Sequence, residues 1–163
     1  MDIEQEKAQL KEAVTEIEAQ EPATRWLFVT IGADNCAHDE LTHRFGQMER
    51  AWDKLDLEAF DVRGWLKVTE VSTSYATPAK PLHPHYHALM AVRPHYFQWG
   101  AWNNGFKWAT EFKKCLDVEM WTDGDASEVR SMEHVIDYLF KPNGYPYPKE
   151  TTAGGNIKAL LEE

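Results

Sequence analysis

The sequence predicts a single domain of the α+β class, and three observations lead to this prediction. The chain has 163 residues, of which 43% are hydrophobic, so it is long enough to bury a substantial core. Four segments carry apolar side chains at helical spacing, whereas three others have the composition or alternation of β-strands. Two of these strands are joined by a proline-rich connector, which favours an antiparallel hairpin.

The chain begins with a predicted helix and a predicted central strand. Residues 3–20 carry a thin apolar stripe among Glu and Lys, which is typical of an amphipathic helix on the edge of a domain. The stripe consists of Ile3, Leu10, Val14 and Ile17. Residues 25–32, RWLFVTIG, are apolar on both faces and rich in aromatic and β-branched side chains, so they predict a central strand.

The middle of the chain predicts a helix followed by the hairpin. Between residues 39 and 60, apolar side chains recur at steps of four and three, which predicts a helix with a core-facing stripe. The stripe is Leu41, Phe45, Met48, Trp52 and Leu55. Residues 64–75 predict a strand that places Glu70 on the same face as Leu66 and Val68, and residues 84–92 predict its partner.

The last third of the chain predicts two helices separated by a short strand. Residues 104–116 have a helical pattern, and residues 117–121, DVEMW, indicate a strand before the turn TDGD. A second helix is predicted from residue 127 until Pro142 ends it, on the apolar positions Val129, Met132, Ile136 and Leu139. The residues after Tyr145 are rich in proline and glycine and only weakly helical.

Charge and cysteine content narrow the cellular setting without excluding a nucleic-acid partner. The formal net charge is −10, but residues 1–21 carry seven acids against two lysines, so much of the charge is terminal. A local basic patch could therefore still bind DNA. Cys36 and Cys115 stand alone, the first residues do not resemble a signal peptide, and no apolar stretch is long enough for a membrane span. We expect a cytoplasmic protein without a structural disulfide or a membrane partner.

The stretch HPHYHALM, residues 83–90, carries a histidine at every second position. On a strand, His83, His85 and His87 would point to the same side, and two imidazoles held side by side can bind a metal ion. Glu70 on the preceding strand is a candidate third ligand, because a carboxylate buried among apolar residues is costly unless it is paired. Two imidazoles and one carboxylate suit Mn²⁺ or Mg²⁺, and Zn²⁺ is also compatible. We expect His83, directly before Pro84, to support a ligand rather than to bind the ion.

The segment SMEHVIDYLFKP, residues 131–142, places Tyr138 and Lys141 three residues apart on a predicted helix. Their side chains would therefore project from one side. A tyrosine can act as a covalent nucleophile once its proton leaves, and a nearby ammonium group favours the phenolate. A tyrosine on an amphipathic helix is more commonly a boundary residue with a solvated hydroxyl, so it is the pairing that makes Tyr138 a candidate nucleophile.

Taken together, these motifs resemble the rolling-circle replication initiators of plasmids, within the HUH superfamily of single-strand endonucleases. RWLFVTIGADN is similar to the first motif of that family, and DYLFKP is similar to its Tyr-x-x-Lys motif. GWLKVTEVS followed by HPHYHALMAV and HYF is similar to the metal-site region. The resemblance extends from about residue 24 to residue 142.

The resemblance implies a central five-stranded antiparallel sheet with flanking helices, related to ferredoxin-like and RRM-like layouts. It also implies a metal-dependent endonuclease and strand transferase that cuts single-stranded or hairpin DNA at a replication origin. The tyrosine would form a 5′-phosphotyrosyl link and release a 3′-hydroxyl for a host polymerase, with a host helicase as a further partner. In those terms His85, His87 and Glu70 hold Mn²⁺ or Mg²⁺, Tyr138 is the nucleophile, and Lys141 orients or offsets charge.

The chain departs from the family pattern one helical turn before the tyrosine. Relatives often carry an acidic residue there that activates water, whereas this chain has His134 flanked by Glu133 and Asp137. These three residues are candidates for water activation, and a second transfer by Tyr145 or Tyr147 is the alternative. We divide the chain into an acidic N-terminal helix (residues 1–22), an HUH endonuclease domain (23–148) and a C-terminal tail (149–163).

Three other functions remain open from the sequence. Relaxases and transposases share the same chemistry and differ in biological role. An RRM-like sheet could instead stack single-stranded bases on Trp99, Trp102 and Trp108 without cutting, although large aromatic residues are usually buried. A structural zinc site is less favoured because the chain has no paired cysteines.

Overall fold

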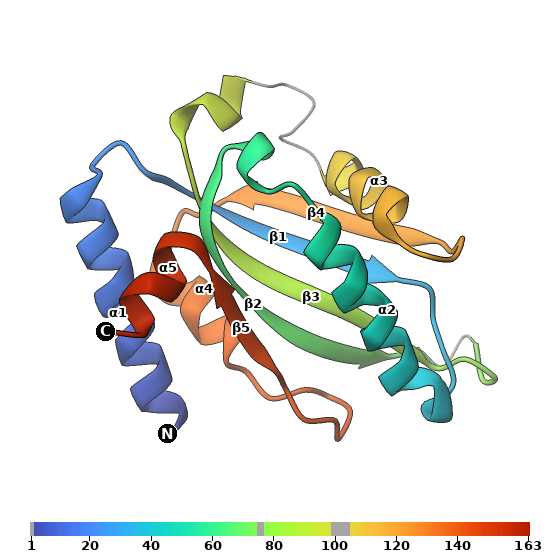
Figure 1. Cartoon of the computed structure of the whole chain (residues 1–163). Helices are drawn as coiled ribbons and strands as arrows, with labels where there is room; N and C mark the ends of the chain where they lie inside the picture. Colours follow the sequence, from blue (N-terminus) through green and yellow to red (C-terminus); the bar gives the residue numbers. More distant parts are fainter. Residues whose placement is uncertain (1, 75–76, 99–104) are drawn as a thin grey trace.

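The structure is a computed structural model that describes residues 2–74, 77–98 and 105–163. It is a five-stranded antiparallel sheet with helices on both faces, which confirms the predicted α+β class (Figure 1). The strand order is β4-β1-β3-β2-β5. The strands are β1 Arg25–Ala33, β2 Val62–Thr73, β3 Leu82–Val92, β4 Thr122–Glu128 and β5 Thr151–Gly154. The α-helices are α1 Ile3–Gln20, α2 Leu41–Lys54, α3 Gly105–Cys115, α4 Met132–Leu139 and α5 Gly155–Leu161, and short 3₁₀ turns are η1 His38–Glu40, η2 Glu58–Phe60 and η3 Pro94–Gln98.

The sheet separates two hydrophobic cores, because successive side chains on each strand point to opposite faces. On β3, Tyr86 and Met90 pack with α2 and α3, whereas Leu89 and Ala91 pack with α1, α4 and α5. Figure 1 shows α2 and α3 lying across one face of the sheet. We call that side the α2 face and the other side the α4 face. Since β3 lies in the middle of the sheet and is buried along almost its whole length, both cores depend on it.

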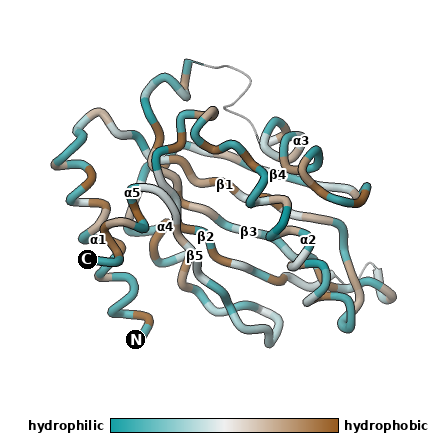
Figure 2. The backbone as a smooth tube through the Cα atoms, viewed as in Figure 1, coloured by the Kyte–Doolittle hydropathy of each residue, from teal (hydrophilic) through white to brown (hydrophobic). Residues whose placement is uncertain are grey.

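Helix α1 confirms the predicted stripe and places it against the sheet. Leu10, Val14 and Ile17 are buried, while Ile3 is 46% exposed. The helix begins with a capping box in which Asp2 and Gln5 bond each other's backbone amides. In Figure 2, hydrophilic and hydrophobic segments alternate along α1, as expected of a helix with one buried face. Among the described residues, no helix has the length and apolar content that crossing a bilayer requires.

Two predicted boundaries in the last third of the chain are wrong. The strand is not DVEMW but the following segment TDGDASE, whose first four residues were predicted as a turn, and the next helix begins at Met132 instead of residue 127. β4 is an edge strand that pairs only with β1, so its mostly polar side chains remain partly exposed and give no apolar signal. Ser131 caps α4 by accepting a hydrogen bond from the backbone N–H of His134.

The C-terminal segment that we described as a tail contributes two elements to the fold. β5 pairs with residues 65–68 of β2 and forms the edge of the sheet opposite β4. α5 buries Ile157 in the core of the α4 face. β5 has only four residues, TTAG, too few for a hydrophobic period, which is why the sequence did not predict it.

A buried lysine ties β2 to α2 and to the edge strand. The Lys67 side chain is 2% exposed, and its ammonium group donates to Glu49 at 2.6 Å and to Thr152 at 2.7 Å. The Tyr86 hydroxyl donates to the same Glu49 oxygen at 2.9 Å. The ammonium group also lies within 5.3 Å of three ring centroids, those of Trp52, Trp65 and Tyr86. The α2 face is thus held by one cation surrounded by hydrogen-bond acceptors and aromatic rings.

We expect Lys67→Ala to lower the free energy of unfolding by about 2–4 kcal/mol, because it leaves a cavity and removes the link to Thr152. Lys67→Met keeps most of the volume, and the half-exposed Glu49 can be solvated, so this variant should cost less than about 1.5 kcal/mol. Urea denaturation followed by circular dichroism measures both. Equal losses in the two variants would mean that the charge, not the packing, holds this face.

Candidate metal centre and tyrosine site

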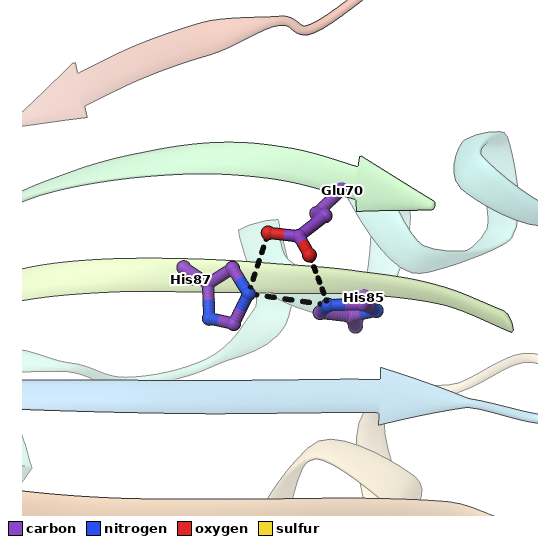
Figure 3. A group of neighbouring side chains, drawn as sticks. All are labelled: Glu70, His85 and His87. Carbon is purple, nitrogen blue, oxygen red and sulfur yellow. Dashed lines mark hydrogen bonds and ion pairs between the residues drawn. The ribbon is translucent and has the colours of Figure 1, made fainter. Parts of the chain in front are cut away.

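The pairing of β2 with β3 brings Glu70 directly opposite His85 and Val68 opposite His87. Figure 3 shows the Glu70 carboxylate reaching from β2 toward both imidazoles on β3. Its two oxygens lie 3.5 Å from His85 Nε2 and 2.8 Å from His87 Nε2, and the two Nε2 atoms are 3.1 Å apart. The three residues predicted as metal ligands therefore converge at one point on the α4 face.

Hydrogen bonds on the far side of each ring orient the two imidazoles. His85 Nδ1 lies 3.2 Å from the His83 carbonyl oxygen, which can only accept, so Nδ1 carries the hydrogen in that bond. His87 Nδ1 lies 2.9 Å from the Thr30 hydroxyl. In neutral rings with hydrogen on Nδ1, both Nε2 lone pairs point toward the Glu70 carboxylate. Three acceptor groups, one carboxylate and two imidazoles, then face one another, an arrangement that needs a cation or a proton between them.

The ionisation states also suit a cation. When hydrogen rather than a metal ion lies between these groups, hydrogen bonds from His85 and His87 hold the pKa of Glu70 far below its usual range, although burial acts in the other direction. Burial lowers the pKa of His87, and its bond with Glu70 only partly offsets this effect. A metal ion requires a charged carboxylate and a neutral imidazole, and these shifts favour both.

The spacing of the ligand atoms fits a small divalent ion. One ligand atom from each residue can be chosen so that all three lie within 4.8 Å of one another. Each Nε2 atom is 2.8 or 3.5 Å from one of the two carboxylate oxygens and 3.1 Å from the other Nε2. An octahedral ion with ligands at about 2.1 Å separates neighbouring ligand atoms by about 3 Å. One carboxylate and two imidazoles leave other positions open, so the set suits a site that also receives water or substrate oxygens. The residues thus fit a divalent metal ion.

Tyr138 lies beside this cluster, in the last turn of α4. Its ring centroid is 4.9 Å from that of His87, and the residue is 42% exposed. Phe28 on β1 stacks on His87 at 5.5 Å and meets the edge of Tyr138 at 5.9 Å, so it fixes the two rings relative to each other. Burial, together with the charge of Glu70, raises the pKa of Tyr138. The phenol is therefore protonated at neutral pH in the absence of a cation.

A groove of about 470 Å³ adjoins Tyr138, between the start of α1 and the end of α4. Lys141, His134 and Asp137 line it, and Lys7 from α1 forms an ion pair with Asp137 at 3.3 Å. The groove thus collects Tyr138 with three residues predicted for the site. Glu133 is exposed on α4 and does not line this groove.

His83 lies next to the cluster but faces another partner. Its Nε2 is 3.4 Å from the Asp123 carboxylate on β4, with β1 between the two strands. The contact crosses β1 at Gly32, where a Cβ would collide with both side chains. His83 therefore supports His85 through its backbone carbonyl, while its own ring turns to β4.

Three residues at the site were missed or not assigned from the sequence. Thr30 and Phe28 contact His87 from β1, and only their place in an apolar strand hinted at them. The Lys149 ammonium donates to the backbone oxygens of Leu139, at 2.9 Å, and of Lys141, and so holds the end of α4. Burial lowers the pKa of Lys149, with a further decrease from Lys141 and an opposing attraction to Glu70. Nothing in the local sequence indicated that Lys149 contacts the end of α4.

The structure separates other predicted aromatic residues from the site. Tyr145 bonds His38 at 2.7 Å and Tyr147 stacks on Phe45 at 5.5 Å, and both tyrosines pack against the core of the α2 face. Their contacts thus lie on the face opposite Glu70, His85 and His87, and a second transfer by either tyrosine stays a prediction. Trp108 is fully buried and does not offer a stacking surface. Trp99 and Trp102 lie outside the described residues.

The fold and the three converging ligands beside Tyr138 are those expected of proteins that initiate DNA replication. Comparison with protein families bears this out: residues 3–141 match the family described as replication protein, and the chain belongs to that family. The match confirms the resemblance drawn from the motifs.

Two relatives carry the name protein rep. The chain is 27% identical over 127 residues to that of Lentilactobacillus hilgardii, covering 76% of this chain and 40% of the relative. It is 29% identical over 117 residues to that of Streptococcus pneumoniae serotype 2, strain D39, covering 68% and 36%. The match thus spans less than half the length of each of these relatives. A comparison with solved structures gave no match.

We expect Thr30→Val to weaken Mn²⁺ binding by about 10- to 100-fold, because the variant no longer holds His87 Nδ1 and the ring can turn. Isothermal titration with MnCl₂ measures the affinity. Thr110→Val on α3, which removes a hydroxyl bonded to the Phe106 carbonyl, is the matched control and should leave the affinity unchanged. An unaltered affinity in Thr30→Val would contradict the role of this bond.

Proposed function

We propose that the chain is a metal-dependent endonuclease and strand transferase that nicks single-stranded or hairpin DNA at a replication origin. The observation that carries this proposal is the convergence of Glu70, His85 and His87 beside the exposed ring of Tyr138. Membership in the replication protein family supports a role at an origin. The extent of the HUH endonuclease domain, residues 23–148, belongs to the same proposal.

Each residue has a chemical role in this proposal. Glu70, His85 and His87 hold the ion, Mn²⁺ or Mg²⁺, which when bound polarises the scissile phosphate. Tyr138 attacks the phosphorus, and the 5′-phosphate becomes linked to its hydroxyl oxygen while the 3′-oxygen leaves. Lys141 offsets phosphate charge at the mouth of the groove, and Lys149 holds the end of α4 so that Tyr138 stays beside His87.

The end of the reaction requires either water or a second strand at the phosphotyrosine. His134 and Asp137 line the groove with Tyr138, so we propose them for activating water, with Asp137 restrained by Lys7. Glu133 has weaker support because it lies outside that groove. A free 3′-hydroxyl that returns to the same phosphate would instead rejoin the strand.

A relaxase or transposase would use the same residues, and a DNA-binding module would use the same sheet without cutting. The described part of the chain favours DNA cutting over simple base stacking. Its cluster brings together one carboxylate and two imidazoles, three acceptor groups that would repel a phosphate in the absence of a cation. A module that only stacked bases would have no use for that arrangement.

We expect Tyr138→Phe to abolish the covalent adduct between protein and single-stranded DNA, because the attacking oxygen is gone. The measurement incubates the protein with fluorescent single-stranded oligonucleotides and Mn²⁺, followed by a denaturing gel. Tyr145→Phe removes the corresponding hydroxyl on the α2 face, so its adduct should equal that of the unaltered protein. An adduct that persists in Tyr138→Phe would move the nucleophile to another residue.

We expect Glu70→Gln to reduce adduct formation by at least about 100-fold while single-stranded DNA binding in EDTA stays equal or tightens slightly. The substitution removes one ligand charge but also removes a negative charge from the binding face. Gel assays give the first quantity and fluorescence anisotropy the second. Unchanged cutting in Glu70→Gln or in His87→Ala would contradict the role of the metal cluster, whereas binding of single-stranded DNA without any cutting by the unaltered protein would favour the non-catalytic module.

A further inference from the structure

Five rings follow one another across the α4 face of the sheet. Neighbouring centroids lie 6.3, 5.4, 4.7 and 4.9 Å apart along the row Trp121, His83, His85, His87 and Tyr138. The two terminal rings belong to exposed residues, Trp121 at 56% and Tyr138 at 42%. The ligand cluster therefore lies between two exposed aromatic residues, and the proposed function uses only one of them.

The strand arrangement holds Trp121 beside the histidine row. It directly precedes β4, after the buried Met120, and β4 is bound to β1 along its whole length. Because Gly32 has no side chain, Asp123 approaches His83 over β1, and the His83 ring lies next to the indole. An exposed tryptophan is thus kept at the edge of the site by the backbone of an ordered strand.

Charge differs between the two ends of the row. The Asp123 carboxylate lies 3.4 Å from His83 across Gly32, so it belongs to the Trp121 end and disfavours a phosphate there. Lys141 and Lys7 lie at the Tyr138 end, where a phosphate is favoured. An exposed aromatic ring close to a carboxylate suits the uncharged face of a nucleobase.

The direction of attack determines which nucleotide would reach this ring. In phosphoryl transfer the attacking and leaving oxygens lie roughly in line on opposite sides of the phosphorus. Tyr138 is at the His87 end of the row, so the leaving 3′-oxygen points toward His83 and Trp121. The bond from the Tyr138 oxygen to phosphorus forms as the bond to the 3′-oxygen breaks. The phenol proton passes to water, and the 3′-oxygen takes up a proton from water.

We propose that Trp121 stacks on the base immediately 5′ of the nick, the one whose sugar carries the leaving 3′-oxygen. The inference rests on the proposed function and adds the direction in which the DNA strand crosses the sheet. It also gives the site a means of holding the released 3′-end close to the phosphotyrosine, as rejoining of the strand requires.

The experiment uses an oligonucleotide that the unaltered protein cuts with Mn²⁺, and replaces one base at a time around the nick by an abasic residue. For the unaltered protein, we expect the rate of adduct formation to fall by about ten-fold or more only when the base immediately 5′ of the nick is missing. Trp121→Ala should show a similar loss on the intact oligonucleotide and no further loss on that abasic one. Trp121→Phe should retain most of the rate and the sensitivity.

Phe106→Ala is the matched control, since Phe106 is a 77% exposed aromatic residue on α3, the helix that packs on the α2 face. It should behave like the unaltered protein on every oligonucleotide. The proposal is overturned if Trp121→Ala slows intact and abasic oligonucleotides by the same factor, or if the sensitive base lies 3′ of the nick. A protein that forms no adduct with any oligonucleotide would instead contradict the proposed function. In that case fluorescence anisotropy still tests the Trp121 contact. An abasic residue should weaken DNA binding by the unaltered protein but should not weaken binding by Trp121→Ala.

Discussion

The register between β2 and β3 is the constraint on which the site depends. Glu70 faces His85 because Val68 faces His87 and Leu66 faces Leu89, and these apolar side chains must enter the core of the α4 face. A slip of one residue would move Glu70 to the α2 face, and it would also remove Leu66 and Val68 from the core of the α4 face. The free energy that buries the apolar part of the hairpin therefore also fixes the positions of the three ligands. The three candidate ligands are thus positioned by the same strand pairing that buries the apolar residues of the hairpin.

The two faces of the sheet have different roles: the α2 face stabilises the fold, and the α4 face carries the candidate site. On the α2 face, a continuous core and the enclosed Lys67 hold β2, β3 and β5 against α2. On the α4 face, α1, α4 and α5 cover the apolar positions, and the polar row begins where that cover stops at His87. Tyr138 lies on this boundary, with Phe28 below it and solvent above. A partly buried phenol at the limit of the core has a defined position and is still accessible from solvent, as the proposed reaction requires.

The sequence predicted the centre of the molecule better than its edges. Leu66, Val68 and Glu70 on one strand and the alternating histidines on the next were enough to place the ligand cluster, because the period of a strand is two residues. The family resemblance supplied the number of strands and the nucleophile. β4 and β5 were not predicted because edge strands need no apolar period. Lys149 was not predicted because it bonds to backbone oxygens at the end of α4. Contacts that depend on backbone acceptors leave no pattern of side-chain types to recognise.

An acidic protein that acts on DNA needs its negative charge in the right places. The acids of α1 that line its groove with α5, Glu12 and Glu16, face away from the tyrosine, whereas Lys7 of the same helix reaches the groove at Tyr138. In the proposed reaction the Glu70 carboxylate lies directly under the scissile phosphate, and a divalent ion there would reverse its effect on the DNA. Asp123 of β4 lies at the other end of the row, beside His83, where a base rather than a phosphate fits. The net charge of −10 is thus compatible with a DNA substrate, because screening leaves only charges within about 10 Å to act strongly on a bound strand.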